Sequence, residues 1–195
     1  MESNTEYLKH YLKSLVTAIE HFESEGFLMM VEMLKEARQA RKNVFVIGNG
    51  GSASSASHIA NDWIKNTRQK GKPDLKVLTI NDIAIFSAYA NDEGYESVYA
   101  EQIRSFGEED DVLITMSTSG NSPNILKAIQ TAKEMGIKTI GWTGETGGKM
   151  RNEVDLCLGI TSDYCGMIED MHMVFGHIIT IALSDEVNNF CKQIN

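Results

Sequence analysis

Residues 44–53 read VFVIGNGGSA, and this stretch decides the fold. Its first four residues are β-branched or aromatic, which is typical of a short buried strand. Gly48, Gly50 and Gly51 then permit positive φ angles and a close approach of the backbone to a ligand. A helical pattern begins at Ala53. The segment therefore predicts a strand, a tight loop and a helix, which together open a parallel α/β fold.

Four further runs of strand-forming residues follow, each ending in glycine or polar residues. They are KVLTI (76–80), DVLITMS (111–117), KTIGWTG (138–144) and DLCLGI (155–160). Helical segments are expected at 53–66, about 83–106 and 123–135, with a short turn near 147–152 and a long last helix over roughly 166–188. This alternation predicts a three-layer αβα sandwich around a five-stranded parallel sheet.

The first 42 residues contain helical patterns only. Apolar residues recur at helical spacing over 6–24, Gly26 breaks that pattern, and a second helix is predicted over 27–42. The apolar face of this second helix either packs inside the chain or meets another subunit, and the pattern favours neither. Since no linker or repeat divides the sequence, we expect one domain over 1–195, with 1–42 as an N-terminal helical pair.

The composition narrows the class of partner. The chain has 195 residues with 18 Lys and Arg against 27 Asp and Glu, so its net charge is 18 − 27 = −9. An acidic chain repels nucleic acid and anionic lipid, and neither is expected as a partner. Three cysteines, an odd number without metal-site spacing, favour a reducing, cytoplasmic compartment. No signal peptide is visible and no apolar run approaches the ~20 residues of a membrane span.

A serine-rich turn, STSGNSP (117–123), follows the third predicted strand. Ligands of open parallel sheets bind outside the carboxyl ends of the strands, and this turn lies at such an end. Pro123 suits the first position of a helix and Ser122 its N-cap. Hydroxyl groups, backbone N–H groups and a helix N-terminus can together hold a phosphate without a basic side chain.

The glycine loop has two possible ligands. Residues 48–53 fit the loose dinucleotide-binding pattern G-x-G-x-x-A, but that pattern expects an acidic residue about 20 positions on, and Asp82 lies too far along. A nicotinamide cofactor is therefore a weak alternative to a phosphosugar. Asn91 and Asp92 are candidates for binding sugar hydroxyls, or they simply end a helix at Gly94.

Imidazoles and carboxylates gather on two of the predicted helices. His58 and Asp62 are four residues apart and share a helix face. The last helix carries Glu169, Asp170, His172 and His177. Two imidazoles with two carboxylates suit a borderline divalent ion such as Zn²⁺, although a solvated polar face would show the same pattern.

Taken together, these segments resemble the sugar-isomerase (SIS) domain family, and within it the enzymes that isomerise sedoheptulose 7-phosphate. The resemblance covers nearly the whole chain. Its motifs are GNGGSA (48–53), the His58 helix, ANDEGYE (90–96), STSGNS (117–122), GWTGETGGKM (141–150) and IEDMHMVFGHII (168–179).

The resemblance implies the roles of individual residues. Sugar-binding residues would be Asn49, Gly50, Gly51, Ser52, Asn91 and Asp92, with Asp62 and Glu169 also touching the substrate. Phosphate-binding residues would be Ser117, Thr118, Ser119 and Ser122. Ligands of a divalent metal, expected to be Zn²⁺, would be His58, Asp62, Glu169 and His177. The family also implies a homotetramer whose active sites are lined by more than one subunit.

The implied reaction converts sedoheptulose 7-phosphate to heptose 7-phosphate through an enediolate, with Asp62 and His177 as the acid–base pair and the metal polarising the carbonyl. Three positions depart from the family pattern: Asp62 replaces Glu, Glu169 replaces Gln, and Asn61 replaces an acidic residue. The Asp62 side chain is one methylene shorter than that of glutamate. Glu169 adds a negative charge that should strengthen the binding of a divalent cation.

Two alternatives stay open. One is a non-catalytic SIS protein that binds phosphosugars and regulates a protein partner, which the Asp62 substitution keeps open. The other is the same chemistry on a different phosphosugar such as a hexose phosphate, since the loops indicate a phosphate and a polyol without counting carbons.

Overall fold

The structure, a computed structural model, describes residues 5–162, 164–184 and 190–192. Its centre is a parallel sheet in the order β2-β1-β3-β4-β5. The strands are β1 (Asn43–Gly48), β2 (Lys76–Leu78), β3 (Val112–Met116), β4 (Lys138–Gly144) and β5 (Leu156–Ile160). The predicted five-stranded parallel sheet is confirmed.

The strand order creates a topological switch point between β1 and β3. The chain moves from β1 outward to β2, then returns past β1 to continue with β3 on its other side. The connections that leave β1 and β3 therefore run to opposite faces of the sheet, and their loops separate above the strand ends. Such a point is where open α/β sheets bind ligands. The glycine loop after β1 and the serine-rich turn after β3 both lie there.

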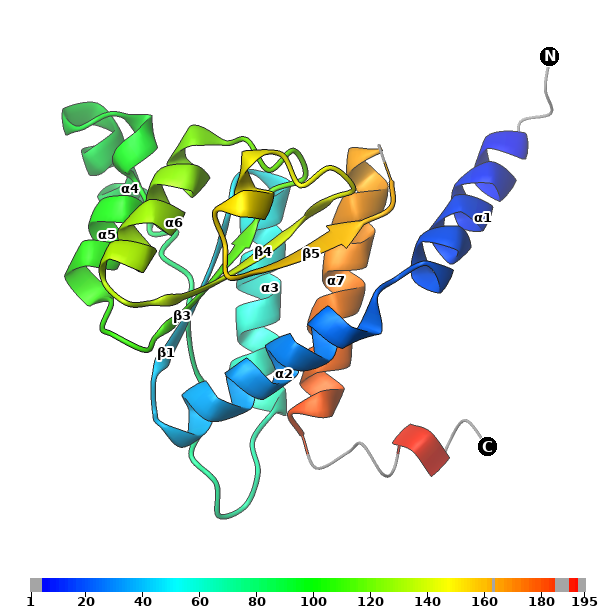
Figure 1. The fold of residues 1–195 in the computed structure, drawn as a ribbon, viewed down its shortest axis with the longest axis horizontal. Coiled ribbons are helices and arrows are strands. Elements are labelled where there is room, and N and C mark those ends of the chain that lie inside the picture. Colours follow the sequence, from blue (N-terminus) through cyan, green and yellow to red (C-terminus); the bar gives the residue numbers. More distant parts are fainter. Residues whose placement is uncertain (1–4, 163, 185–189, 193–195) are drawn as a thin grey trace.

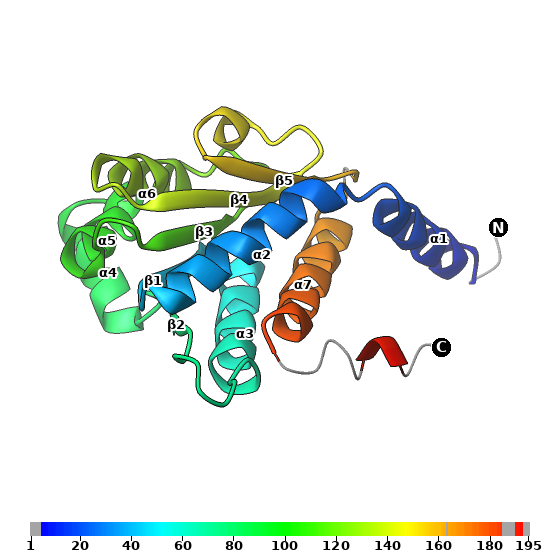
Figure 2. The ribbon, with the colours of Figure 1, turned by 60° about the horizontal axis from the view of Figure 1, so that its bottom comes forward.

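Helices cover both faces of the sheet (Figures 1 and 2). One face carries α2 (Ser24–Gln39), α3 (Gly51–Asn66) and α7 (Cys165–Ala182), and the other carries α4 (Ile83–Asp92), α5 (Ala100–Phe106) and α6 (Pro123–Glu134). Successive residues of β1 explain the two layers, since Val44 and Val46 enter the core under α3 and α7 while Phe45 and Ile47 enter the core under α5 and α6.

Two predicted helix boundaries were wrong. The helix expected over about 83–106 is three pieces, α4, the 3-10 turn η1 (Tyr95–Ser97) and α5, because Gly94 adopts φ +88° and ends the first piece. Gly26 does not break the N-terminal pattern but lies inside α2. The first helix, α1 (Glu6–Glu20), ends earlier, and the second begins at Ser24.

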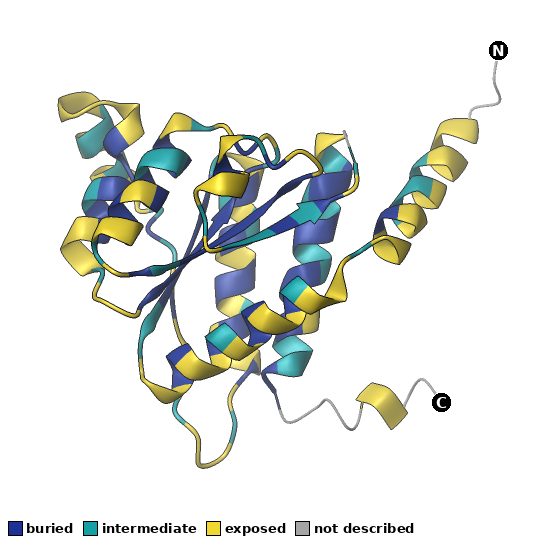
Figure 3. Ribbon diagram, viewed as in Figure 1, coloured by how far each residue is buried: buried dark blue, intermediate teal, exposed yellow. Residues whose placement is uncertain are grey.

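Helix α1 projects from the body of the molecule (Figures 1 and 3). Four of its aliphatic side chains, Leu8, Leu12, Val16 and Ile19, are about half exposed at 48–53 %. Its contacts with the body include the buried Ala18 and a hydrogen bond from the Tyr11 hydroxyl to Asp170 Oδ2 at 2.5 Å, which raises the pKa of Tyr11 to about 12. Among the described residues, no helix is long and apolar enough to cross a membrane.

His172 on α7 faces the core instead of the polar side of its helix. It is fully buried beside the Trp142 ring, with ring centroids 5.9 Å apart. Neither ring nitrogen has a hydrogen-bond partner within the described part of the chain. Burial lowers the pKa of His172 to about 3, so the ring stays neutral in the folded protein under ordinary conditions.

We expect His172→Leu to make the free energy of unfolding less dependent on pH between about pH 3 and pH 6.5. The unfolded chain takes up a proton below about pH 6.5, whereas the folded chain takes it up only near pH 3, so folding loses stability as the pH falls between them. At ~1.4 kcal/mol per pH unit, the wild type should lose roughly 2–3 kcal/mol more than the variant between pH 7.5 and pH 4.5. Urea unfolding at both pH values measures this difference, and equal losses would contradict it.

Candidate active site

The glycine loop is held at the carboxyl end of β1 by its backbone. Gly50 adopts φ +53°, and α3 begins at the next residue. The buried Tyr99 hydroxyl donates a hydrogen bond to the Gly48 carbonyl, and burial raises the pKa of Tyr99. Ser52 is 6 % exposed and packs close to Gly48, so its side chain is turned away from solvent.

Asn124 joins the glycine loop to the helix that follows the serine-rich turn. Its side-chain amide exchanges two hydrogen bonds with Asn49: Asn49 Nδ2 donates to Asn124 Oδ1 at 2.9 Å, and Asn124 Nδ2 donates to Asn49 Oδ1 at 2.8 Å. The Tyr95 hydroxyl also donates to Asn49 Oδ1, at 3.1 Å. Asn124 is 1 % exposed and was not predicted as a site residue. The sequence signal that could have identified Asn124 is a polar residue on the buried face of a helix that starts at the site.

The serine-rich turn has a shape that neighbouring backbone enforces. Gly120 adopts φ +61°, and a Cβ atom there would lie 1.9 Å from the Gly147 carbonyl oxygen. The Met150 N–H donates to the Gly120 carbonyl, and the Lys149 N–H donates to the Asn121 side chain. The segment after β4 therefore fixes the shape of the serine-rich turn through a close backbone contact and hydrogen bonds.

Donor groups in this turn remain available for an anion. Among the described residues, the backbone N–H groups of Thr118, Ser119 and Ser122 have no hydrogen-bond partner. Ser122 is the N-cap of α6, as predicted, with Pro123 in the first turn. Its hydroxyl does not cap the helix but lies 3.4 Å from the Ser117 hydroxyl. Hydroxyls, free amides and a helix N-terminus thus meet in one turn, which suits a phosphate.

The structure brings together three of the predicted metal ligands. His58 Nε2 lies 3.3 Å from His177 Nε2 and 3.3 Å from Asp62 Oδ2, and His177 Nε2 lies 3.7 Å from the same carboxylate oxygen. The three ligand atoms belong to one cluster that can hold a metal ion. We call His58, Asp62 and His177 the helix triad. Donor atoms ~2.1 Å from a tetrahedral zinc ion lie about 3.4 Å from one another, so these spacings fit that ion.

Two amides orient the carboxylate of the helix triad. Asn61 Nδ2 and Asn66 Nδ2 donate to Asp62 Oδ1 at 3.2 and 3.3 Å, while Asp62 Oδ2 faces the imidazoles. Both imidazole side chains are more than half exposed, and the Asp62 side chain is 18 % exposed. The triad is therefore open to a substrate on one side and fixed by α3 on the other.

Glu169 does not join the helix triad within one chain. Its carboxylate lies over the start of α3, where a Cβ atom on Gly51 would be 2.9 Å from Glu169 Oε1. Eight residues separate Glu169 from His177 on α7, which is ~12 Å along the helix. A negative charge at the N-terminus of α3 is stabilising there, and it also disfavours a phosphate on the glycine loop. This leaves the serine-rich turn as the better phosphate site.

Two other predictions concerned α4. Asn91 Nδ2 donates to Asp92 Oδ1 at 2.7 Å, and within the described residues neither side chain hydrogen-bonds to the glycine loop or the serine-rich turn. Their sugar-binding role stays a prediction. Asp82 is the N-cap of α4 and accepts hydrogen bonds from the backbone of Ala84 and Ile85. It is therefore engaged in capping and does not lie at the end of β2, where a ribose-binding carboxylate would be needed.

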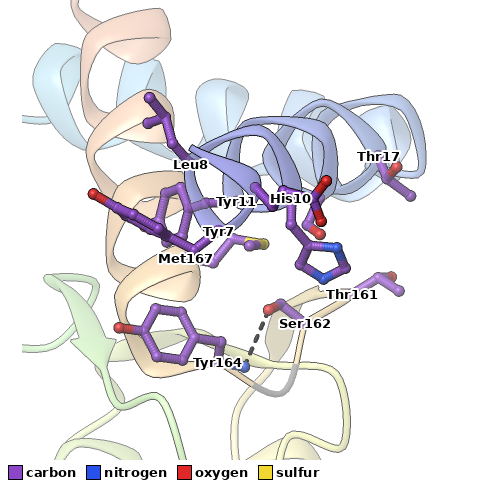
Figure 4. Close-up of a pocket in the computed structure, with 11 residues that line it drawn as sticks. Tyr7, Leu8, His10, Tyr11, Thr17, Thr161, Ser162, Tyr164 and Met167 are labelled. Atoms are coloured by element: carbon purple, nitrogen blue, oxygen red, sulfur yellow. Dashed lines mark hydrogen bonds between the residues drawn. The ribbon is translucent and has the colours of Figure 1, made fainter. Parts of the chain in front are cut away.

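A cavity of about 900 Å³ lies under α1, and none of its lining residues belongs to the helix triad, the glycine loop or the serine-rich turn. Tyr7, Tyr11 and Tyr164 surround it with His10, and the loop after β5 closes one side (Figure 4). One wall is the projecting helix α1, so its shape depends on whatever covers that helix. We place the phosphate site at the strand ends, in the serine-rich turn.

Comparison with known proteins gives consistent matches. The family model described as the SIS domain matches residues 6–144. A phosphoheptose isomerase from Aneurinibacillus thermoaerophilus is 36 % identical over 189 residues, covering 93 % of this chain and 94 % of the relative. A phosphoheptose isomerase from Helicobacter pylori (strain Shi470) is 39 % identical over 176 residues, covering 89 % and 90 %. The solved phosphoheptose isomerase from Neisseria gonorrhoeae superimposes with a TM-score of 0.84 at 26 % identity, covering 92 % and 97 %.

Proposed function

The chain belongs to the SIS domain family, and we propose that it is a phosphosugar isomerase that interconverts sedoheptulose 7-phosphate and an aldose heptose 7-phosphate. Relatives named phosphoheptose isomerase match it over nearly its whole length. One observation from the molecule itself carries the proposal. Two imidazoles and a carboxylate from α3 and α7 converge at 3.3–3.7 Å, and the serine-rich turn offers free phosphate-binding groups.

The arrangement of the two groups suits a long sugar phosphate. In a ketose 7-phosphate the phosphate and the reacting carbonyl lie at opposite ends of the carbon chain. His58 and Asp62 lie seven and eleven residues beyond Gly51, which places the helix triad ~10–16 Å along α3 from the strand ends. A substrate anchored by its phosphate in the serine-rich turn would therefore extend its carbonyl end toward the triad, and a fixed anchor supplies orientation.

Asp62 and His177 are the proposed acid–base pair. In the proposed reaction, one group removes a proton from C1 of the ketose while the other protonates the C2 carbonyl oxygen, which gives the enediol. The first group then returns its proton to C2 while the second removes the proton of the C1 hydroxyl, which gives the aldose carbonyl. The amides of Asn61 and Asn66 hold Asp62 Oδ1, so that Oδ2 is directed at the reacting side. A divalent ion, expected to be Zn²⁺, would be held by the helix triad and would polarise the substrate oxygens. A set of three protein ligands is typical of catalytic zinc sites, in which the ion would also be accessible to a substrate oxygen.

The exposed apolar helices support a homotetramer. Helix α4 has no buried residue although it is largely apolar, and Ile83 is 78 % exposed. Helices α1 and α2 also present exposed aliphatic side chains, including Leu12 and Leu28. Apolar surface of this extent is typical of a protein–protein interface. The interface role of residues 1–42 and the cytoplasmic location both stay predictions.

An isomerase assay with a panel of sugar phosphates tests the function. We expect turnover of sedoheptulose 7-phosphate to exceed that of hexose and pentose phosphates, and to fall by at least ~10²-fold after a chelator removes the metal, with recovery on adding Zn²⁺. Turnover that is insensitive to the chelator would contradict the metal assignment. Phosphosugar binding without turnover on any substrate would favour the non-catalytic regulator.

A further inference from the structure

The helices that carry the triad touch each other at residues adjacent to it. Trp63 follows Asp62 and Ile59 follows His58 on α3, and Gly176 precedes His177 on α7. Ile59 is 1 % exposed, Trp63 is fully buried, and Gly176 is also buried. Each residue of the triad is therefore bonded in sequence to a residue of the crossing between α3 and α7.

Gly176 allows the two helices to approach closely. A Cβ atom at this position would lie 2.6 Å from Ile59 Cγ1 and 3.0 Å from Ile59 Cδ1. Ile59 Cγ1 is one bond from its own Cβ, and an isoleucine in a helix has one strongly preferred χ1 rotamer. The side chain cannot turn away without strain, so a larger residue at 176 must move the helices apart.

Trp63 stabilises the same crossing of α3 and α7 with a hydrogen bond. Its indole Nε1–H donates to the Gly176 carbonyl at 3.0 Å, and that carbonyl also accepts from the Thr180 hydroxyl at 2.9 Å. The Trp63 ring lies against the Trp142 ring, with centroids 6.4 Å apart. Since the indole is fully buried, water cannot replace this bond if it is lost.

The geometry of the triad depends on this crossing. His58 and Asp62 are both on α3, so their spacing is set within one helix, whereas His177 comes from α7. An aspartate side chain is short, and Asp62 Oδ2 lies 3.7 Å from His177 Nε2 only because the helices are close. We propose that Trp63 and Gly176 are positioning residues that set the α3–α7 separation at which the short Asp62 carboxylate and the His177 imidazole share one divalent ion.

This inference rests on the proposed function, and its test measures metal binding in addition to turnover. The metal-free protein is titrated with Co²⁺, and the visible absorption of the bound ion gives the dissociation constant. Changes in residues that orient metal ligands typically cost 10–100-fold in metal affinity, and we expect Gly176→Ala to weaken Co²⁺ binding by roughly that factor.

A compensating substitution distinguishes positioning from general damage. Asp62→Glu adds one methylene, so in the Gly176→Ala background it should span the wider gap and recover at least ~10-fold in Co²⁺ affinity, within the range for such ligand-orienting changes. Alone, in the narrow crossing, the same change should weaken binding. A double variant that binds Co²⁺ no better than Gly176→Ala would overturn the inference, as would a Gly176→Ala variant that binds like the wild type.

Trp63→Phe provides a second variant in case Gly176→Ala does not fold. It keeps an aromatic ring and removes the hydrogen bond to Gly176, and it should weaken Co²⁺ binding by about 10-fold. The matched control is Thr115→Val. Thr115 is also fully buried and loses a hydrogen bond to a backbone carbonyl, that of Ile140 at 3.2 Å, but it lies on β3 and faces Met150 in the core on the other side of the sheet. Equal losses of Co²⁺ affinity in both variants would overturn the inference.

The two hypotheses fail in different ways. A wild type that binds Co²⁺ but isomerises no sugar phosphate contradicts the proposed function, and the affinities of the variants still decide the positioning role. A wild type that binds no Co²⁺ contradicts the shared ion and overturns the inference directly.

Discussion

His177→Gln is expected to reduce kcat/KM for sedoheptulose 7-phosphate by at least ~10³-fold. Positioned acid–base groups contribute 10²–10⁴-fold, and this substitution also removes a ligand atom from the helix triad. Glutamine is polar and of similar length, but its amide does not titrate near neutral pH. Since the His177 side chain is 57 % exposed, the change leaves no buried cavity. The measurement is steady-state kinetics with Zn²⁺ present.

The serine-rich turn should be unaffected by this substitution. Binding of sedoheptulose 7-phosphate, followed by calorimetry, should change by less than about 10-fold if the phosphate supplies most of the affinity. Thermal unfolding should match the wild type, since surface substitutions usually change stability by less than ~0.5 kcal/mol. His21→Gln is the matched control, because His21 is an exposed imidazole at the C-cap of α1, far along the chain from the helix triad. Near-native turnover in the His177 variant would remove the acid–base assignment.

The sequence was sufficient to predict the sheet and the convergence of His58, Asp62 and His177. Strand-forming runs that alternate with helical segments predict parallel order, and parallel order brings the carboxyl ends of the strands to one edge. Spacing on a helix also predicted that His58 and Asp62 share a face, and the structure brings His177 to them. These features depend on local periodicity, which a single sequence contains.

Contacts between helices could not be predicted in the same way. The family resemblance implied that Glu169 shares a metal ion with His58, Asp62 and His177, but within one chain its carboxylate lies against Gly51. The hydrogen bond from Trp63 to Gly176 depends on how two distant segments cross. The reciprocal amide pair of Asn49 and Asn124 likewise joins residues 75 positions apart. Periodicity predicts which face of its helix or strand a residue occupies, but not which residue of another element it contacts.

Gly120→Ala is expected to remove the phosphate site while leaving the helix triad intact. A Cβ atom at Gly120 would lie 1.9 Å from the Gly147 carbonyl oxygen and 2.6 Å from its carbon, both of them backbone atoms that cannot rotate away. The turn must therefore open, which displaces the N–H groups of Thr118 and Ser119. We expect KM for sedoheptulose 7-phosphate to rise by ~100-fold, since an ångström of misplacement can cost that factor. Co²⁺ affinity of the metal-free protein should stay within about threefold of the wild type, because ligand atoms are unmoved.

The matched control separates the steric clash from the cost of the backbone conformation. Gly71 has φ +80°, comparable to φ +61° at Gly120, but a Cβ atom on Gly71 would meet nothing within 4 Å. Gly71→Ala therefore carries the same left-handed penalty of ~1 kcal/mol without the contact to Gly147. If both variants lost stability but only Gly120→Ala lost substrate affinity, the loss would belong to the shape of the serine-rich turn. If Gly120→Ala kept a native KM, the phosphate would have to bind elsewhere, and the glycine loop under Glu169 would be the remaining candidate.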